Sequence, residues 1–243
     1  MFDDLPSSLG LEAWSTGDPT PLFDRAIRLT PEQVAQALRS GHLLDRAFDR
    51  FLPLDLQALS SMYWTPLQVV QRAARWLSDL DVRTVVDVGS GSGKFCVAAA
   101  LTSDCRFLGL EQRPRLVAAA RALAELFAVE DRVEFVEGTL GETDVPPADA
   151  YYFFNPFGEN LYGAGDNIDE DVELSDERYG RDVAIAEDLL RRVPAGTFLL
   201  TYNGFGGRVP EGYQEVRVDR EMPSVLRMWQ KVREPGTAGV IRE

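Results

Sequence analysis

The sequence predicts an α/β fold: a mostly parallel sheet with helices on both faces and an antiparallel hairpin at its end. Apolar, β-branched runs alternate with segments of helical periodicity between residues 84 and 202, a pattern typical of parallel strands joined by crossover helices. Two further strand-like runs, at 213–218 and 225–232, are too close in sequence for a crossover helix. They should therefore pair antiparallel at one edge of the sheet.

The alternating part accounts for five strands and three helices, so the terminal hairpin brings the expected sheet to seven strands. The segment 84–88 is apolar almost throughout, as expected for a parallel strand covered on both faces. The strands are predicted at 84–88, 106–110, 133–136, 150–154 and 197–202, and the helices at 94–102, 114–127 and 181–192.

Residues 1–61 are expected to form a helical extension, and residues 62–243 the sheet domain. The pattern Thr-Pro-Glu-Gln at 30–33 is that of a capping box at a helix start, and a similar Thr-Pro-Leu-Gln box at 65–68 predicts a helix to about residue 80. Pro53 should end the helix between these two. The apolar face of that middle helix is expected to consist of Leu44, Phe48, Phe51 and Leu52.

Composition and charge exclude several classes of function. The net charge is −14, from 39 acidic and 25 basic residues, so the average surface repels nucleic acid and no such partner is expected. Cys96 and Cys105 form neither a disulfide framework nor a metal-ligand pattern, so no metal is expected. No apolar run approaches the roughly 20 residues that span a bilayer, and the N-terminus is acidic. We therefore expect no membrane contact and a cytoplasmic location.

The stretch VVDVGSGSGKF, residues 85–95, has features of three kinds of cofactor turn. A triphosphate loop needs a glycine where Val88 stands and a hydroxyl where Phe95 stands, so that class is excluded. A dinucleotide turn needs its third glycine where Lys94 stands, which leaves that class weakly supported. Lys94 is then expected on a helix surface.

Asp87, two residues before the first glycine, decides among these cofactors. A carboxylate at a strand end repels a pyrophosphate but suits a cationic group. The run DVGSGSG resembles the first motif of the class I S-adenosylmethionine-dependent methyltransferases, and the resemblance extends over residues 62–232. It implies a Rossmann-like seven-stranded sheet with an N-terminal helical extension, and S-adenosylmethionine as the cofactor.

The resemblance further implies a cofactor site at the carboxyl ends of the first three strands. Glu111 would accept hydrogen bonds from both ribose hydroxyls, since one carboxylate can accept several. Adenine would meet the Thr139 hydroxyl or the backbone amides of Thr139 and Leu140. The expected cofactor residues are Asp87, Gly89, Ser90, Gly91, Gly93, Glu111, Gln112, Gly138, Thr139, Leu140 and Asn155.

The fourth strand ends in FFNPFG, residues 153–158, which resembles the acceptor motif of methyltransferases that act on amino nitrogens, although its second proline is missing. Asn155, Phe157 and Tyr202 are expected to line the acceptor site, because ligands lie at the carboxyl ends of the strands in such sheets. For Tyr202, the alternative to lining the acceptor site is a purely structural role. An oxygen acceptor commonly needs a histidine base, and His42, the only histidine, is expected to be exposed or to cap a helix. The sequence thus favours a nitrogen acceptor, with an already acidic hydroxyl as the alternative.

Two other segments are candidates to close the site. The aromatic pair in Met62-Tyr63-Trp64 either covers the cofactor or anchors the core. The acidic stretch 159–177 is expected to be a long loop, either solvated or acting as a lid that favours a cationic substrate.

The sequence therefore predicts an S-adenosylmethionine-dependent methyltransferase that acts on a small molecule or a protein side chain. Two alternatives stay open: a non-catalytic module that binds the cofactor as a regulator, and transfer of another group, such as aminopropyl, on the same fold.

Overall fold

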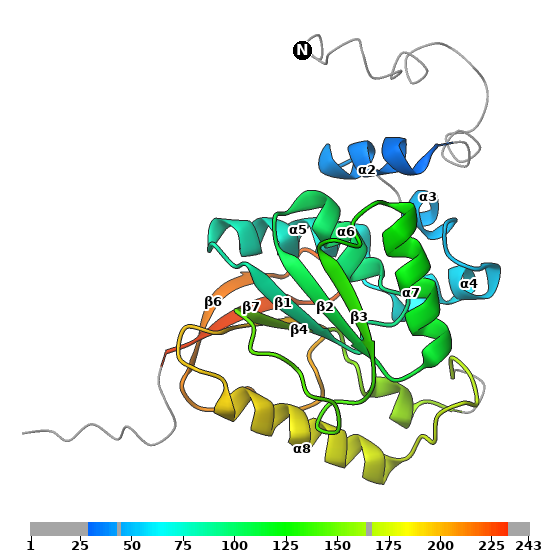
Figure 1. The fold of residues 1–243 in the computed structure, drawn as a ribbon. Helices are drawn as coiled ribbons and strands as arrows, with labels where there is room; N and C mark the ends of the chain where they lie inside the picture. Colours follow the sequence, from blue (N-terminus) through cyan, green and yellow to red (C-terminus); the bar gives the residue numbers. More distant parts are fainter. Residues whose placement is uncertain (1–28, 43–44, 164–166, 233–243) are drawn as a thin grey trace, which may run out of the picture.

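The protein is a mostly parallel seven-stranded sheet in strand order β3-β2-β1-β4-β5-β7-β6 (Figure 1). The computed structural model describes residues 29–42, 45–163 and 167–232. The parallel strands are β1 (Thr84–Val88), β2 (Arg106–Glu111), β3 (Val133–Glu137), β4 (Ala150–Phe153) and β5 (Phe198–Tyr202). Strand order reverses beside β1, which pairs with β2 on one side and with β4 on the other. A crevice at the carboxyl ends of these strands is where such sheets bind ligands.

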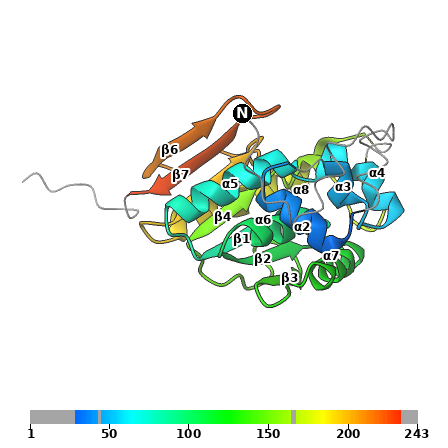
Figure 2. The same ribbon diagram turned by 90° about the horizontal axis from the view of Figure 1, so that it is seen from above.

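Helices cover both faces of the sheet, as the sequence predicts. The helices α5 (Leu67–Asp79), α6 (Lys94–Thr102) and α7 (Pro114–Leu126) pack on one face, and α8 (Asp176–Arg192) lies on the other (Figures 1 and 2). Two apolar clusters result. On β4, for example, Tyr152 belongs to the first cluster, and Tyr151 and Phe153 belong to the second. None of the described helices is both long and apolar enough to cross a bilayer.

The terminal hairpin is confirmed, and its position in the sheet is more specific than the sequence predicts. Strand β7 (Leu226–Lys231) pairs antiparallel with both β5 and β6 (Tyr213–Asp219), so the later strand lies inside the earlier one. Strand β6 is therefore the edge of the sheet. The end of β5 is thus fixed by the last strand of the described chain.

The N-terminal helices share the first apolar cluster with the sheet. They are α2 (Pro31–Arg39), α3 (Asp45–Asp49) and α4 (Leu54–Tyr63). The Thr30 capping box is confirmed, because its hydroxyl and the Gln33 side chain satisfy each other's backbone amides. The cluster includes Val34, Leu38, Phe48, Leu52 and Leu56 alongside residues of α5, α6 and the strands. The domain boundary at 61/62 stays a prediction.

One expectation for this region is wrong, and another is not tested. Pro53 does not end the helix that contains Phe48; α3 has already ended, and Pro53 caps the start of α4, a helix that the sequence did not predict. A proline is tolerated there because its missing N–H would be unpaired anyway. Leu44 lies outside the described residues, so the face assigned to it is not tested.

The capping box expected at Thr65 is not formed, although the helix that it should begin, α5, exists. The Thr65 hydroxyl lies 2.9 Å from the Tyr152 hydroxyl and makes no cap at the start of α5. The carboxylate of Asp45, in α3, accepts the Leu67 amide at 3.0 Å instead. A side chain distant in sequence thus replaces the local cap, which a motif of four residues cannot reveal.

Lys94 is buried, which contradicts its expected place on a helix surface. Its side chain is 2% exposed, and its Nζ lies 2.6 Å from Asp45 Oδ1 and 2.8 Å from Asp49 Oδ1. It also donates to Ser60 Oγ at 3.1 Å. Lysine is tolerated in this interior because two carboxylates compensate its charge. The first residue of α6 thereby ties α3 and α4 to the glycine turn.

Helix α8 begins earlier than the sequence predicts, inside the acidic stretch. Ser175 is its N-cap and accepts the Arg178 amide at 3.1 Å. Asp176 and Glu177 occupy the first turn, where negative charge is favourable against the helix dipole. These two acidic residues therefore belong to the start of a helix. The expectation of a loop throughout 159–177 is wrong at its end.

Candidate cofactor and acceptor site

A cavity of about 430 Å³ lies at the carboxyl ends of β1, β2, β4 and β5, within the usual range for a small-molecule site. It opens to solvent beside Met62 and Tyr162, whose side chains are 53% and 41% exposed. Most residues that the sequence assigns to the site line this cavity. These are Gly89, Gly91, Glu111, Gln112, Gly138, Thr139, Leu140, Asn155, Phe157 and Tyr202.

The glycine turn is held between two distant segments. Gly91 has a φ of 54°, and a Cβ there would lie 2.4 Å from the Trp64 ring. Gly89 has a φ of 75°, and a Cβ there would lie 2.7 Å from the side chain of Pro156. Both the left-handed backbone and the close packing require glycine. The turn therefore positions the N-terminal helices against the end of β4.

The backbone amides of this turn are used within the protein. Gly89 and Ser90 donate their N–H groups to the Leu110 carbonyl at 2.9 and 3.0 Å, and Gly93 donates to the Ser90 carbonyl at 2.9 Å. Gly91 donates to Glu111 Oε2 at 3.0 Å. A phosphate site needs such amides to point at the ligand. The turn is thus poorly suited to a pyrophosphate, in agreement with the choice made from the sequence.

Glu111 joins the glycine turn to the start of α7. Its Oε2 accepts the Gly91 amide, and its Oε1 accepts the Arg113 amide at 2.9 Å. Burial raises the pKa of Glu111, and the charge and amide of Arg113 oppose that rise. A carboxylate has about four acceptor positions, so each oxygen keeps one for a ligand in the cavity.

Three of the expected cofactor residues do not line the cavity. The Asp87 carboxylate lies beneath the turn, 3% exposed, and its Oδ2 accepts the Cys96 thiol at 3.3 Å. Ser90 and Gly93 are also buried behind the turn, and a Cβ on Gly93 would meet Phe135 and Ala120. In this arrangement these residues support the turn from below. A direct role toward the cofactor stays a prediction.

Burial raises the pKa of Asp87 to about 7, and the charge of Glu111 adds to the rise, whereas the Cys96 thiol opposes it. The free energy of ionising this carboxyl is therefore sensitive to any cation that approaches the turn.

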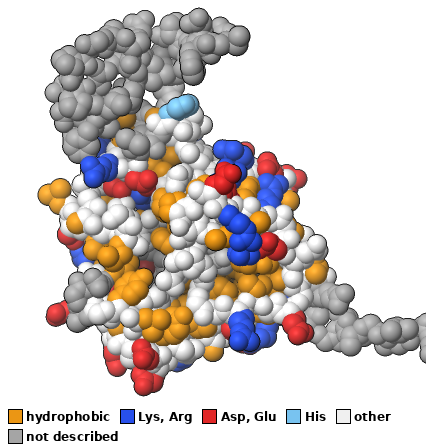
Figure 3. Space-filling model, turned by 180° about the vertical axis from the view of Figure 1, so that it is seen from behind, with side chains coloured by type: hydrophobic (Ala, Val, Ile, Leu, Met, Phe, Trp, Pro, Cys, Tyr) orange, Lys and Arg blue, Asp and Glu red, His pale blue; other side chains and the backbone are white. Residues whose placement is uncertain are grey.

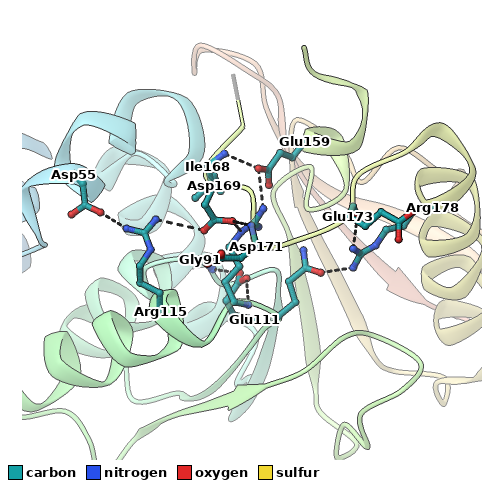
Figure 4. Close-up of polar contacts among 12 residues, drawn as sticks. Asp55, Gly91, Glu111, Arg115, Glu159, Ile168, Asp169, Asp171, Glu173 and Arg178 are labelled. Carbon is teal, nitrogen blue, oxygen red and sulfur yellow. Dashed lines mark hydrogen bonds and ion pairs between the residues drawn. The ribbon is translucent and has the colours of Figure 1, made fainter. Parts of the chain in front are cut away.

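Arg113 organises the acidic segment above the cavity, although no pattern in the sequence pointed to it. Its guanidinium is 3% exposed and binds Glu159 Oε1 at 3.0 Å and Asp169 Oδ1 at 2.8 Å. Glu159 also accepts the Ile168 amide at 2.7 Å, as the contacts in Figure 4 illustrate. Arg115 reaches the other oxygen of Asp169 and also pairs with Asp55 of α4. The acidic segment is thus attached to the end of β2.

Arg178 attaches the far end of the same segment. It donates to the Gln112 side chain and to the Glu173 carbonyl at 2.6 Å (Figure 4). It also donates to Asp182 Oδ2 at 3.4 Å. Gln112 therefore lines the cavity with its amide oxygen already bonded. Arg178 and Asp182 line the cavity too and were not expected from the sequence.

The structure reduces the number of groups with which Thr139 can contact an adenine. Its hydroxyl donates to Glu142 Oε2 at 2.7 Å, so it offers only acceptor capacity to a ligand. Gly138 donates its amide to the Glu111 carbonyl at 2.9 Å. The remaining candidates for an adenine are the backbone groups of Thr139 and Leu140, which line the cavity.

Asn155 occupies a left-handed turn at the end of β4, with a φ of 42°. Its amide N–H donates to the Gly204 carbonyl at 2.9 Å, and its carbonyl accepts the Gly158 amide at 3.1 Å. Its side chain packs against Gly158, where a Cβ would lie 2.1 Å from Nδ2. Within the described chain, the side-chain amide makes no hydrogen bond and lines the cavity. The motif thus holds a polar group ready for a ligand.

Aromatic side chains form the wall beyond Asn155. Phe154 and Tyr202 lie 4.9 Å apart between ring centroids, at 49°. On the opposite side, Tyr63 lies 6.0 Å from Trp64 and 6.2 Å from Tyr162. Trp64 is 5% exposed and donates its indole N–H to the Leu56 carbonyl, so it both anchors the core and lines the cavity. The two roles considered for this pair are therefore compatible.

His42 is exposed and does not line the cavity, as expected. It is the chain's only histidine, visible in pale blue at the surface in Figure 3. On the same face, Lys and Arg side chains lie scattered among Asp and Glu side chains. This face therefore offers no broad basic surface.

Replacing Gly91 with alanine should lower the free energy of unfolding by about 2 kcal/mol and weaken ligand binding in the cavity. The new methyl group would collide with the Trp64 ring. The alanine would also have to adopt the left-handed backbone conformation of Gly91. Chemical denaturation measures the first effect. Gly180→Ala is the control, since Gly180 lies in α8 and a methyl group placed there meets no atom within 4 Å, so that alanine should be neutral or stabilising.

No protein-family model matches the chain, and no curated protein matches it. Several solved structures are similar to it. An RNA methyltransferase from Salinibacter ruber, in complex with S-adenosyl-L-homocysteine, is 26% identical with a TM-score of 0.50, over 70% of this chain and 94% of that one. An O-methyltransferase from Bacillus cereus, also in complex with S-adenosyl-L-homocysteine, is 13% identical with a TM-score of 0.52, over 82% and 96%.

The strand order, the inserted last strand and the glycine turn at the end of β1 agree with these similarities. The chain has the fold of the class I S-adenosylmethionine-dependent methyltransferases.

Proposed function

We propose that the protein is a methyltransferase that binds S-adenosylmethionine in this cavity. The observation that carries the proposal is the position of Glu111, at the end of β2 and hydrogen-bonded to the glycine turn. Each of its oxygens accepts one backbone amide and keeps one acceptor position, as two adjacent ribose hydroxyls would require. The similar structures solved with S-adenosyl-L-homocysteine support the same cofactor.

The turn fits an adenosine derivative without phosphate. Four of its backbone amides, those of Gly89, Ser90, Gly91 and Gly93, are paired inside the protein. The carboxyls of Asp87 and Glu111 lie beneath and beside the turn. A cation near these groups would favour their ionised forms. Both features favour a cationic cofactor over a dinucleotide.

When bound, the cofactor supplies an electrophilic methyl carbon: an acceptor lone pair forms the new bond while the electron pair of the C–S bond goes to sulfur. The residues of this chain would act mainly by holding the acceptor in line with that carbon and excluding water. Asn155, Phe157 and Tyr202 line the cavity where the acceptor would lie. No histidine of the described chain lines it to serve as a base.

We propose nitrogen as the acceptor atom. The support is the side-chain amide of Asn155, which makes no hydrogen bond within the described chain and can accept an amine hydrogen. The similar solved structures include an enzyme named as an O-methyltransferase, so they give this choice no support. The acceptor atom therefore has to be measured.

We propose a small molecule or a protein side chain as the acceptor, and no nucleic acid. The Salinibacter ruber protein is named an RNA methyltransferase, yet the net charge here is −14, which opposes a polyanion. The arginines at the cavity are bonded to acidic groups of the same chain. A cytoplasmic location is proposed as well, since Cys96 and Cys105 are buried free thiols.

Glu111→Gln should weaken S-adenosyl-L-homocysteine binding about 5- to 150-fold, because one acceptor oxygen becomes a donor and a charged hydrogen bond is lost. Isothermal titration calorimetry of both proteins measures this. Glu134→Gln, which changes an exposed carboxylate on the neighbouring strand, should leave the affinity unchanged. Equal affinities for the wild type and Glu111→Gln would place the cofactor elsewhere.

A labelled-methyl assay separates the rival functions. Incubation with cell extract and S-adenosylmethionine labelled in its methyl group should give a labelled product. Tight cofactor binding without labelled product would instead support a regulatory module. A parallel incubation uses cofactor labelled in its aminopropyl carbons instead. A labelled product in that incubation alone would support the other transfer.

A further inference from the structure

The cavity has two parts with different chemistry. The cofactor part lies around the ends of β1 and β2. All the charged side chains that line the cavity in the described chain lie there or are linked to it by contacts, since Glu159 binds Arg113, Arg178 donates to Gln112, and Asp182 binds Arg178; they are Glu111, Arg113, Glu159, Arg178 and Asp182. The second part, around the ends of β4 and β5, is lined by aromatic, proline and neutral polar residues. It includes Tyr63, Phe154, Asn155, Tyr202, Pro223 and Ser224.

The charged groups of the cofactor part are already paired, so they offer little to a charged acceptor. Arg113 binds Glu159 and Asp169, and Arg178 binds Asp182. Glu111 accepts two backbone amides. An ionic acceptor would therefore lose water in the second part without gaining a counter-charge, which is costly.

The walls of the second part are largely aromatic. Phe154 and Tyr202 pack together at 4.9 Å between ring centroids. Tyr63 stands beside the opening and Pro223 follows from the loop before β7. Aromatic side chains gain contact area from a planar apolar ligand, and their rings add an orientation preference.

We propose that the acceptor is an uncharged planar ring compound whose amino group is methylated. The ring lies against Phe154 and Tyr202, and its polar group is held by the side-chain amide of Asn155. This inference rests on the proposed function, because it assigns the acceptor of the same site. It replaces the cationic substrate that the acidity of residues 159–177 suggested.

An aromatic wall can also serve as a cage for an organic cation. A cage needs several ring faces turned toward one point. Here the Trp64 ring packs against Gly91, and the planes of Phe154 and Tyr202 are tilted at 49° to each other. No carboxylate of the described chain lines this part of the cavity. The geometry therefore favours a neutral ring over a cation.

Calorimetry on the protein saturated with S-adenosyl-L-homocysteine tests the proposal without requiring turnover. The probes share one ring system and differ in charge: 2-naphthylamine and 2-naphthol are neutral at pH 7.5, 2-naphthoate is an anion, and 2-naphthylmethylamine is a cation. We expect the neutral probes to bind at least ten times more tightly than either charged probe. Phe154→Leu should weaken the neutral probes about fivefold while S-adenosyl-L-homocysteine affinity stays unchanged.

Phe51→Leu is the matched control, because it removes a ring that packs on Phe127 and does not line the cavity. It should leave probe affinity unchanged. Equal or tighter binding of a charged probe overturns the neutral class, and so does a failure of every probe to bind the saturated protein. Failure of S-adenosyl-L-homocysteine itself to bind overturns the proposed function instead, so the two failures are distinguishable.

Discussion

Replacing Lys94 with methionine should lower the free energy of unfolding by about 3–5 kcal/mol, the cost expected when one partner of a buried ion pair is removed. Methionine fills a similar volume, so the loss reports the missing charge. Asp49 is 8% exposed on its side chain and lies 2.8 Å from the Lys94 ammonium, and burial already raises the pKa of Asp49. The charge and the hydrogen bond of Lys94 oppose that rise, so this carboxylate loses a charge partner when the lysine is removed.

A double-mutant cycle identifies the pair as the cause. Asp49→Asn alone should also destabilise the fold, but the double variant should lose much less than the sum of the single losses. Urea denaturation of the four proteins gives the coupling free energy. Additive losses would mean that Lys94 and Asp49 act independently, and that the lysine does not tie α3 to the glycine turn through that carboxylate.

Asp87→Asn should make the protein more stable at pH 8 and change the pH dependence of unfolding. The pKa of Asp87 is raised from 3.8 to about 7 by burial, so the folded state holds this proton more tightly than the unfolded state does. Stability from this group is therefore fully present below about pH 4 and falls as pH rises toward 7. The difference across that range is roughly 4 kcal/mol for a single carboxyl.

The asparagine variant retains the shape and an acceptor oxygen for Cys96 but does not titrate. Urea denaturation of both proteins between pH 4 and pH 8 should give curves that diverge as pH rises, with the variant above the wild type. Any constant effect of the added amide shifts the whole curve and does not produce that divergence. Parallel curves would show that Asp87 is ionised in the folded protein at all these pH values.

Strands and most helices were predictable because their signals are local. The apolar segment at β1, the glycines of the turn and the capping box at Thr30 each depend on neighbours in sequence, and all are confirmed. Similarly, Glu111 was found because it closes a strand at a fixed spacing after the glycine turn.

The errors arose where a distant side chain replaces a local one. Thr65 has the sequence pattern of a cap, but Asp45 supplies the bond to α5 while the Thr65 hydroxyl pairs with Tyr152. Lys94 follows the glycines as a surface residue would, but two aspartates from α3 make its burial possible. Tertiary partners of this kind leave no periodic signal in one sequence.

The candidate site shows the same limit. Arg113 and Arg178 line the cavity through contacts with polar and acidic groups that lie up to 66 positions away along the chain. Asp87 was correctly placed at the turn, but which side of the turn its carboxylate occupies depends on Cys96 in the following helix.

The last strand lies inside the one before it, and this has a consequence for the order of events during synthesis. Tyr202 lines the cavity at the end of β5, and β5 pairs on its outer side with β7, which ends at Lys231. Strand β7 follows β5 in the chain, so β5 lacks its outer neighbour until synthesis has passed Lys231. A nascent chain that has already folded β1 to β4 would therefore still lack one wall of the cavity. Cofactor present in the cell would then bind only after the ribosome has released β7, and would stabilise the completed sheet rather than guide its assembly.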